Sequence, residues 1–151
     1  MKSFADPRVA DDLLRRLQQL RPDSARRWGR MTAHQMVCHL RDTFLMDTDA
    51  RPVRSVGGPM RQHVMRCVAL YVPVRWPRGL PTLAEVDQEA RGTRPAEFAA
   101  DVAALVATVE QARAGGFFRD RRHPALGALT EAEWKRWAWL HTDHHLRQFG
   151  L

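Results

Sequence analysis

The sequence predicts an all-α fold: an antiparallel four-helix bundle with an additional helix and long loops. Two observations favour this class. Apolar residues recur at helical spacing in four or five segments, and signals for strands are nearly absent. A length of 151 residues fits one domain, so we expect residues 1–151 to form a single helical-bundle domain.

Three capping patterns predict where helices begin. Asp6-Pro7 combines an N-cap with proline at the first helical position, and this helix should end before Pro22. A capping box at 32–35 opens the second helix, which is expected to run to about Thr48. A second box at 130–133 opens the last helix.

Glycine and proline divide the remaining chain. We expect a third helix, a proline-rich connection with a possible helical turn, a fourth helix and an irregular segment before the last helix. Their expected ranges are residues 60–71, 72–94 with a turn near 83–89, 95–114, and 117–129.

The formal charge of +7 raises the question of a nucleic-acid partner. The basic residues are scattered and interleaved with 17 acidic ones, and their only local concentrations are at 26–30 and 119–122. We therefore do not expect nucleic acid as a partner. This interpretation would need the arginines gathered on one face.

The sequence also allows predictions about membrane binding and about the cellular location of the protein. No apolar run approaches the roughly 20 residues that span a bilayer, so no membrane partner is expected. The N-terminal residues lack the apolar stretch of a secretory signal. Cys38 and Cys67 have no CxxC spacing, which favours two buried thiols in a reducing compartment and a cytoplasmic location.

The last helix carries the most informative pattern. His141 and His145 are four residues apart and project only about 40° from each other. They share the inward face with Trp134, Trp137 and Gln148. A single buried histidine is usually a hydrogen-bonded core residue. Two on one face, one turn apart, each need a partner or a metal, and such a pair is half of a metal site.

The third ligand should come from another helix. His39 is the best candidate, because it lies on the flank of the second helix, about 110° from the centre of its apolar face. His34 and Cys38 form their own i,i+4 pair, but we expect them on the opposite, exposed side and reject them.

The other histidines have weaker patterns. His63 has no supporting spacing, and His123, before Pro124, is expected to be a structural hydrogen-bonding residue. His144 lies about 100° from His145, at the rim of a cleft or behind the ligands. Because the ordinary pKa of an imidazole is near neutrality, His144 is the predicted proton-transfer residue. Asp42 is the other conceivable general acid.

Several motifs together resemble the DinB-like superfamily, in a branch with no assigned reaction. The resemblance spans about residues 13–148. The motifs are Trp28-Gly-Arg-Met-Thr-Ala-His-Gln-Met-Val-Cys-His39, His123-Pro124, Gly127, Leu129-Thr130, Trp134 and His141-Thr-Asp-His-His-Leu-Arg-Gln148. This resemblance implies a four-helix bundle, often dimeric, in which His39, His141 and His145 hold a divalent metal ion.

The expected function is a metal-dependent enzyme, a thiol-dependent transferase or a hydrolase, acting on a small molecule. Three imidazoles suit zinc, nickel or iron, and such a metal can activate a bound water or thiol or polarise a carbonyl. The resemblance adds a low-molecular-weight thiol as a possible cofactor and a homodimer, for which Trp139 is a conceivable anchor. The alternative is a non-catalytic metal-binding stress-response protein.

Overall fold

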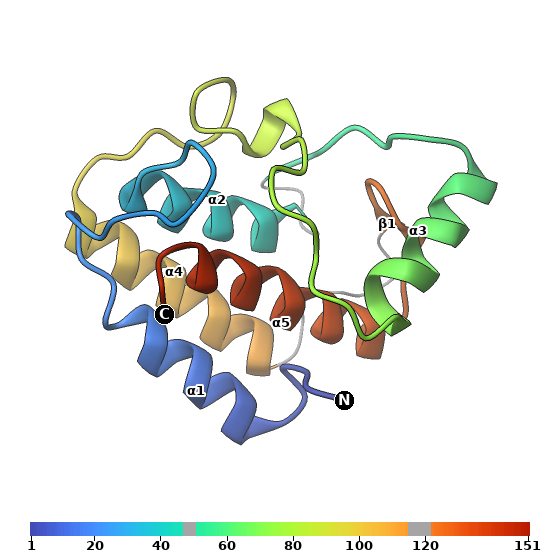
Figure 1. The fold of residues 1–151 in the computed structure, drawn as a ribbon, viewed down its shortest axis with the longest axis horizontal. Helices are drawn as coiled ribbons and strands as arrows, with labels where there is room; N and C mark the ends of the chain where they lie inside the picture. Colours follow the sequence, from blue (N-terminus) through green and yellow to red (C-terminus); the bar gives the residue numbers. More distant parts are fainter. Residues whose placement is uncertain (47–50, 115–121) are drawn as a thin grey trace.

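The computed structural model describes residues 1–46, 51–114 and 122–151, and it is mostly helical (Figure 1). The elements in chain order are α1 (Pro7–Leu17), α2 (Ala33–Leu45), α3 (Pro59–Tyr71), the 3-10 turn η1 (Ala84–Val86), α4 (Phe98–Ala114), β1 (Arg122–His123), β2 (Gly127–Ala128) and α5 (Glu131–Gln148). The expected ends of the second and fourth helices, near 48 and at 115–116, lie outside the described residues, as do residues 117–121 of the expected irregular segment.

The capping patterns are confirmed. The Asp6 carboxylate accepts a hydrogen bond from the backbone N–H of Arg8, and Pro7 occupies the first helical position. Both capping boxes are complete, at the start of α2 and at the start of α5. Local hydrogen bonding therefore defines where the two helices that carry the predicted ligands begin.

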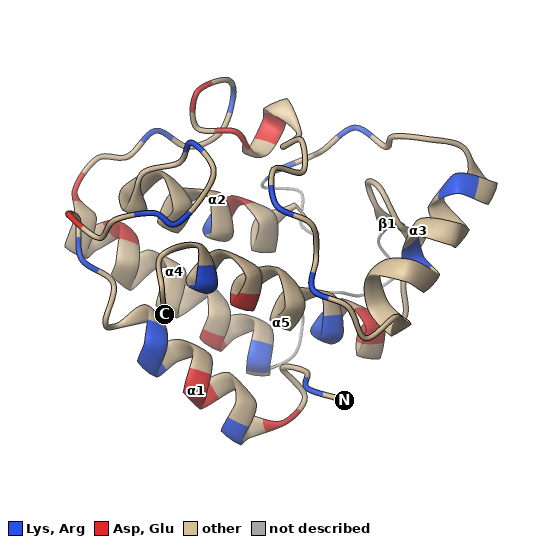
Figure 2. Cartoon of the chain, in the orientation of Figure 1, with Lys and Arg blue, Asp and Glu red and all other residues tan. Residues whose placement is uncertain are grey.

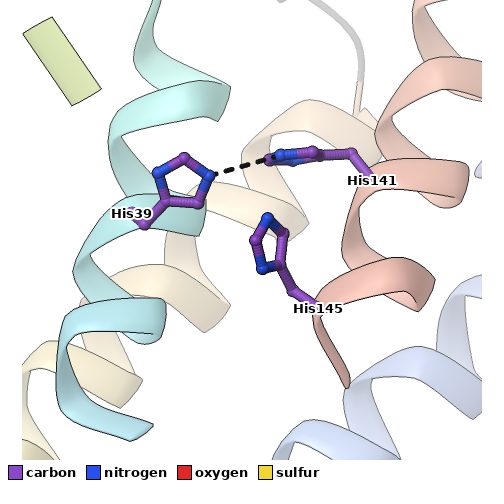
Figure 3. Close-up of side chains that lie close together, drawn as sticks. All are labelled: His39, His141 and His145. Atoms are coloured by element: carbon purple, nitrogen blue, oxygen red, sulfur yellow. Dashed lines mark hydrogen bonds between the residues drawn. The ribbon is translucent and has the colours of Figure 1, made fainter. Parts of the chain in front are cut away.

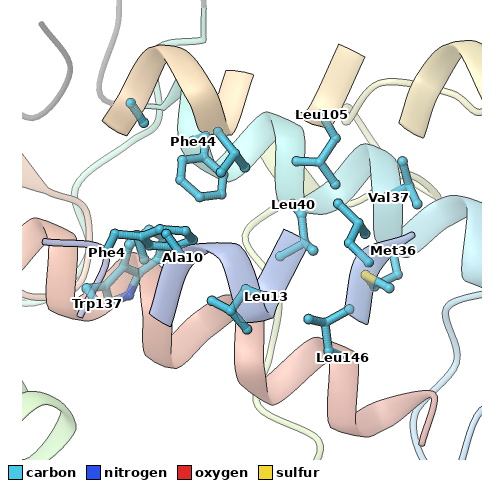
Figure 4. Packing of buried hydrophobic residues seen from close by; sticks show 14 of the residues in the cluster. Phe4, Ala10, Leu13, Met36, Val37, Leu40, Phe44, Leu105, Trp137 and Leu146 are labelled. Carbon is cyan, nitrogen blue, oxygen red and sulfur yellow. The ribbon is translucent and has the colours of Figure 1, made fainter. Parts of the chain in front are cut away.

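The core lies between α1, α2, α4 and α5 (Figure 4). Its largest fully buried side chains include Trp134, Phe44, Leu13, Met36 and Leu105. Within this core α2 packs against α4 and also contacts α5 and η1, so nine of its 13 residues are buried. Such a helix has almost no face turned to solvent.

The burial of α2 corrects one expectation. We expected His34 and Cys38 on an exposed side, but Cys38 is buried and His34 is half-buried, both facing Asp101 of α4. The prediction was wrong because α2 is covered on several sides. An argument from one apolar face cannot identify an exposed face on such a helix.

A two-stranded antiparallel hairpin, which the sequence did not predict, precedes α5. Arg122 pairs with Ala128 and His123 pairs with Gly127. Two residues per strand are too few for a period-2 pattern to be visible. Gly127 adopts φ +74°, and a Cβ there would lie 3.0 Å from the side-chain oxygen of Gln62 on α3. The hairpin thus rests against α3 and leads directly into α5.

Helix α3 lies to one side of the other helices, where it contacts α5 and β2 (Figure 1). Its buried residues are Gln62 and Leu70, whereas several apolar side chains are exposed. Cys67 is exposed on the same helix, so the expectation of two buried thiols holds only for Cys38.

Trp139 of α5 is half-buried, with Lys2 and Arg136 against its ring. It is therefore not a free anchor for a homodimer.

Basic residues are spread over helices and loops with acidic residues between them (Figure 2). Several are ion-paired, such as Arg16 with Asp143 at 2.8 Å and Arg66 with Glu133 at 2.9 Å. Across the described part of the chain the basic residues thus belong to several helices and loops and not to one element. Residues 119–121 of the second basic concentration lie outside the described residues.

In the described residues no helix combines the length and apolarity needed to cross a bilayer.

The buried carboxylate of Asp42 ties the long connection between α3 and α4 to α2. Asp42 has no exposed surface and accepts hydrogen bonds from Gln88 at 2.9 Å and from the backbone and hydroxyl of Thr93, both at 2.7 Å. Arg51 pairs with it at 3.0 Å and also donates to the carbonyl of Glu85 at 2.9 Å. Asp42 is thus a structural anchor and not the general acid that its position in the sequence allowed.

We predict that Asp42→Ala destabilises the protein by about 3–5 kcal/mol, because it leaves Arg51 and the Thr93 amide without their buried acceptor. Urea unfolding followed by circular dichroism measures this change. Asp23→Ala, which removes a carboxylate that is 76% exposed, is the matched control and should shift stability by less than about 0.5 kcal/mol. Equal effects from the two variants would contradict an anchoring role for Asp42.

Candidate metal centre

The three histidines predicted as ligands lie together between α2 and α5 (Figure 3). His39 projects from α2, and His141 and His145 project from successive turns of α5. One ring nitrogen of each lies within 4.8 Å of the others, so this group can hold a metal ion. The predicted triad is therefore brought together by the fold.

Hydrogen bonds at the far side of two rings determine which nitrogen faces the centre. His39 Nδ1 lies 2.7 Å from the carbonyl of Val86, which can only accept, so Nδ1 carries the proton. His145 Nδ1 lies 2.9 Å from Oε1 of Gln148, and the same amide donates from Nε2 to the carbonyl of Trp28. Both rings therefore direct an unprotonated Nε2 toward the centre.

Thr43 contacts the far side of the His141 ring. The Thr43 hydroxyl donates to the carbonyl of Leu40 at 2.8 Å, which leaves its oxygen lone pair as an acceptor. His141 Nδ1 lies 3.5 Å from that oxygen, at the long limit of a hydrogen bond. Trp137 stacks on the His141 ring at 4.8 Å with an angle of 11° between the planes, which restricts its rotation.

The separation of the nitrogens matches metal coordination. His39 Nε2 and His141 Nε2 are 3.3 Å apart. Two nitrogens bound at about 2.0–2.1 Å to a tetrahedral zinc ion lie about 3.3–3.4 Å apart. Without a metal this contact is a hydrogen bond, in which one Nε2 carries a proton and the other accepts it (Figure 3). A metal ion bound between the two nitrogens would take the place of that proton.

The electrostatic environment favours neutral rings. Burial lowers the pKa of His39, and it lowers the pKa values of His141 and His145 well below the usual value. Positive charge on neighbouring histidines lowers the pKa of His141 further. All three rings are thus neutral at pH 7, the state in which imidazole binds a metal.

A second layer of contacts holds the orienting groups in place. The Val86 carbonyl belongs to η1, which is held to α2 through Arg51 and Asp42. Gln148 is held by the Trp28 carbonyl, next to Gly29 at φ +77°. A Cβ at Gly29 would lie 2.5 Å from the Gln148 amide nitrogen, so only glycine permits this close approach.

A cavity of about 570 Å³ opens over the triad. All three histidines and His144 line it. Aromatic and aliphatic side chains form much of the remaining wall, with polar groups among them. These are Trp28, Met31, Met46, Trp76, Leu80, Leu83, Val86 and Trp137, with Gln35, Thr43, Asp87, Gln88 and Glu89. The triad is therefore the floor of a pocket and not a closed core cluster.

Two further histidines occupy the positions that their sequence context suggested. His144 lies in the pocket wall, with its ring 5.8 Å from that of Trp28 and 6.2 Å from that of Trp76. His123 Nδ1 accepts hydrogen bonds from the backbone N–H groups of Ala125 and Leu126, both at 3.1 Å, which confirms its structural role. Burial lowers the pKa of His123 to about 3.

Sequence reasoning missed two of the three orienting groups. Gln148 was on the expected inward face of α5, but Thr43 and the Val86 carbonyl were not identified. Val86 is 47 residues from His39 and acts through its backbone. No side-chain pattern could have revealed such a contact.

The fold and the site define a mostly helical protein with a three-histidine centre at the base of a pocket. The model of a family described as "Protein of unknown function (DUF1569)" matches residues 6–150, and the chain belongs to this family. No curated protein and no solved structure matches the chain. The chemistry must therefore be argued from the site itself.

We predict that Gln148→Leu weakens metal binding about 10–100-fold, because His145 loses the acceptor that fixes its orientation. Titration of the metal-free protein with zinc in the presence of a competing chelator measures the affinity. Gln148→Glu keeps an acceptor for His145 Nδ1 but loses the donor to the Trp28 carbonyl, so its affinity should lie between those of the original protein and Gln148→Leu. Gln19→Leu, in the exposed turn that follows α1, is the control and should bind zinc like the original protein.

Proposed function

We propose that the protein is a DinB-like four-helix bundle formed by α1, α2, α4 and α5, with α3 as the additional helix. Three observations support the assignment: the core shared by these four helices, one histidine on the second helix, and a His-x-x-x-His pair on the last. A cytoplasmic location is part of the proposal, in keeping with a free thiol exposed at Cys67.

We propose further that it is a metal-dependent enzyme, a thiol-dependent transferase or a hydrolase, acting on a small molecule. The observation that carries this proposal is the position of the triad at the floor of a pocket of about 570 Å³. Three protein ligands leave a tetrahedral ion one open position. A structural metal site would instead be closed by a fourth side chain.

A divalent zinc, nickel or iron ion at this position would lower the pKa of a bound water or thiol, or polarise a substrate carbonyl. The protein residues supply binding and orientation. Trp28, Trp76 and Trp137 offer flat apolar surfaces to a substrate, and the polar groups of Gln35 and Gln88 can fix its direction. A low-molecular-weight thiol is the proposed second substrate or cofactor in the transferase reaction.

His144 is the proposed proton-transfer residue. It lines the pocket and adjoins the ligand His145, with 5.3 Å between the ring centroids. Burial lowers its pKa, and the nearby positive charge of Arg147 lowers it further. The ring is therefore neutral at pH 7 and can accept a proton from a group bound in the pocket.

We also propose that the protein forms a homodimer, in which the exposed apolar side chains of α3 are covered by a second copy. Met60, Val64, Val68 and Tyr71 are 77%, 51%, 46% and 49% exposed and recur at helical spacing along one side of this helix. Exposed apolar patches of this kind mark interaction sites. This face replaces Trp139 as the expected anchor.

We predict that the purified protein binds a divalent metal through the triad, and that His141→Ala abolishes this binding. Elemental analysis after loading with zinc, nickel or iron measures occupancy and selectivity. His63→Ala, which changes a histidine of α3 outside the triad, should leave the triad occupied. A triad that stays empty under all three metals would overturn the proposed function.

We predict that metal binding at the triad depends on pH. Burial keeps the pKa values of the three ligands below the ordinary histidine value of 6.5, so protons compete with the metal only below that pH. Bound metal should be constant above pH 6.5 and should fall as the pH is lowered through the depressed pKa values. Metal loss that begins well above neutral pH would contradict this electrostatic account.

We predict that His144→Gln lowers turnover about 10²–10⁴-fold, the usual contribution of one proton-transfer group, while the metal content stays unchanged. Hydrolysis of 4-nitrophenyl esters tests the hydrolase reaction, and substitution of an activated aryl halide by a thiol, with release of halide, tests the transferase reaction. Loss of metal in this variant would make His144 a ligand. A metal-loaded protein without metal-dependent turnover in either assay would favour the alternative, a non-catalytic metal-binding stress-response protein.

A further inference from the structure

A second group of potential ligands lies on the other side of α2. His34 and Cys38, one helical turn apart, face Asp101 in the first turn of α4. One ligand atom of each residue lies within 4.8 Å of the others. Of the residues that the structure describes, only this group and the triad bring three such ligands together.

We propose that His34, Cys38 and Asp101 form a second metal site, which binds zinc and clamps α2 to the first turn of α4. The site is separate from the three-histidine centre and does not depend on the function proposed there. A bound ion would link two helices that already pack closely against each other.

The distances are compatible with coordination after a small adjustment. In tetrahedral zinc geometry, a thiolate sulfur and a carboxylate oxygen lie about 3.6 Å apart, and an imidazole nitrogen and a carboxylate oxygen about 3.4 Å. Cys38 Sγ is 3.7 Å from Asp101 Oδ2, close to the first value. His34 Nε2 is 2.7 Å from the same oxygen, so these two side chains must separate by about 0.7 Å, well within side-chain rotation.

Charge also favours a divalent ion. A thiolate, a carboxylate and a neutral imidazole together carry two negative charges, which neutralise Zn²⁺ in this partly buried position. Burial and the neighbouring Asp101 raise the pKa of the Cys38 thiol to about 12, so without metal the thiol keeps its proton. Zinc binding therefore releases that proton to solvent, while His34 coordinates through its Nε2 lone pair.

The surroundings hold the ligands and leave a path for the ion. The backbone N–H of Ala96 donates to Asp101 Oδ2 at 3.0 Å, and the ring of Phe98 lies edge-on to His34 with 5.3 Å between centroids. The side chains of His34 and Asp101 are 21% and 16% exposed, whereas Cys38 is buried beneath them. A metal can thus enter from solvent, and a water molecule can complete the coordination.

Cobalt binding tests the proposal, because only a thiolate ligand gives a charge-transfer band in the near ultraviolet. The full-length protein should bind about 2 equivalents of Co²⁺, one per three-ligand group, and should show this band. His141→Ala should bind one equivalent fewer and keep the band, so failure of the triad and failure of this site are distinguishable.

Cys38→Ser should lose the band and one equivalent. Cys67→Ser is the matched control: its thiol is exposed on α3 and lies 3.9 Å from His63 Nε2, so it is the other conceivable source of a thiolate. A band that disappears in Cys67→Ser but persists in Cys38→Ser would overturn the proposal. So would a full-length protein with no band, in which the three residues form only a hydrogen-bond network.

Because Cys38 is buried, its substitution can also weaken folding, and His34→Gln provides a second, more exposed variant. In the His141→Ala background, zinc at about 100 times its dissociation constant should raise the melting temperature by roughly 5–10 °C. The added His34→Gln change should remove this rise while circular dichroism shows an unchanged helical content. A rise that persists in the double variant would contradict zinc binding at this position.

Discussion

The geometry of the three-histidine centre depends on the hydrogen bonds and the ion pair made by the buried carboxylate of Asp42. It is fully buried within α2, three residues from His39. It holds Gln88 and Thr93 of the long connection between α3 and α4, and Arg51 of the segment before α3, against that helix. Arg51 in turn fixes the backbone next to Val86, whose carbonyl orients His39. A segment that looks like a loosely structured, proline-rich connection thereby supplies a fixed hydrogen-bond acceptor.

The same principle applies to the other two ligands, with different acceptors. Thr43 from α2 serves His141, and Gln148 from the end of α5 serves His145. The acceptors of His39 and His145 hold a proton on Nδ1 and so present an Nε2 lone pair to the centre. Burial then disfavours the protonated rings. Orientation and desolvation together prepare three neutral donors around one point, which is the condition for binding a metal at neutral pH.

Helix α2 is also the element that separates two chemically different groups of ligands. One side presents His39 to α5 and to the pocket, and the other presents His34 and Cys38 to α4. Three neutral imidazoles leave the charge of a divalent ion uncompensated, which suits activation of a bound group. A thiolate and a carboxylate at the second group would compensate that charge. Because the helix is covered on several sides, both groups are partly withdrawn from water.

The sequence by itself determined the helical class, the starts of α1, α2 and α5, and the three histidines that the fold brings together. These features depend on local physics: a capping side chain reaches only a few residues, and helical periodicity places His141 and His145 on one face. The tertiary structure decided what long-range packing controls. It covered the side of α2 that the apolar pattern predicted to be exposed, and it brought Val86, Thr43 and Asp101 to the histidines that they contact. Such contacts join residues dozens of positions apart and often involve the backbone, so no spacing in the chain encodes them.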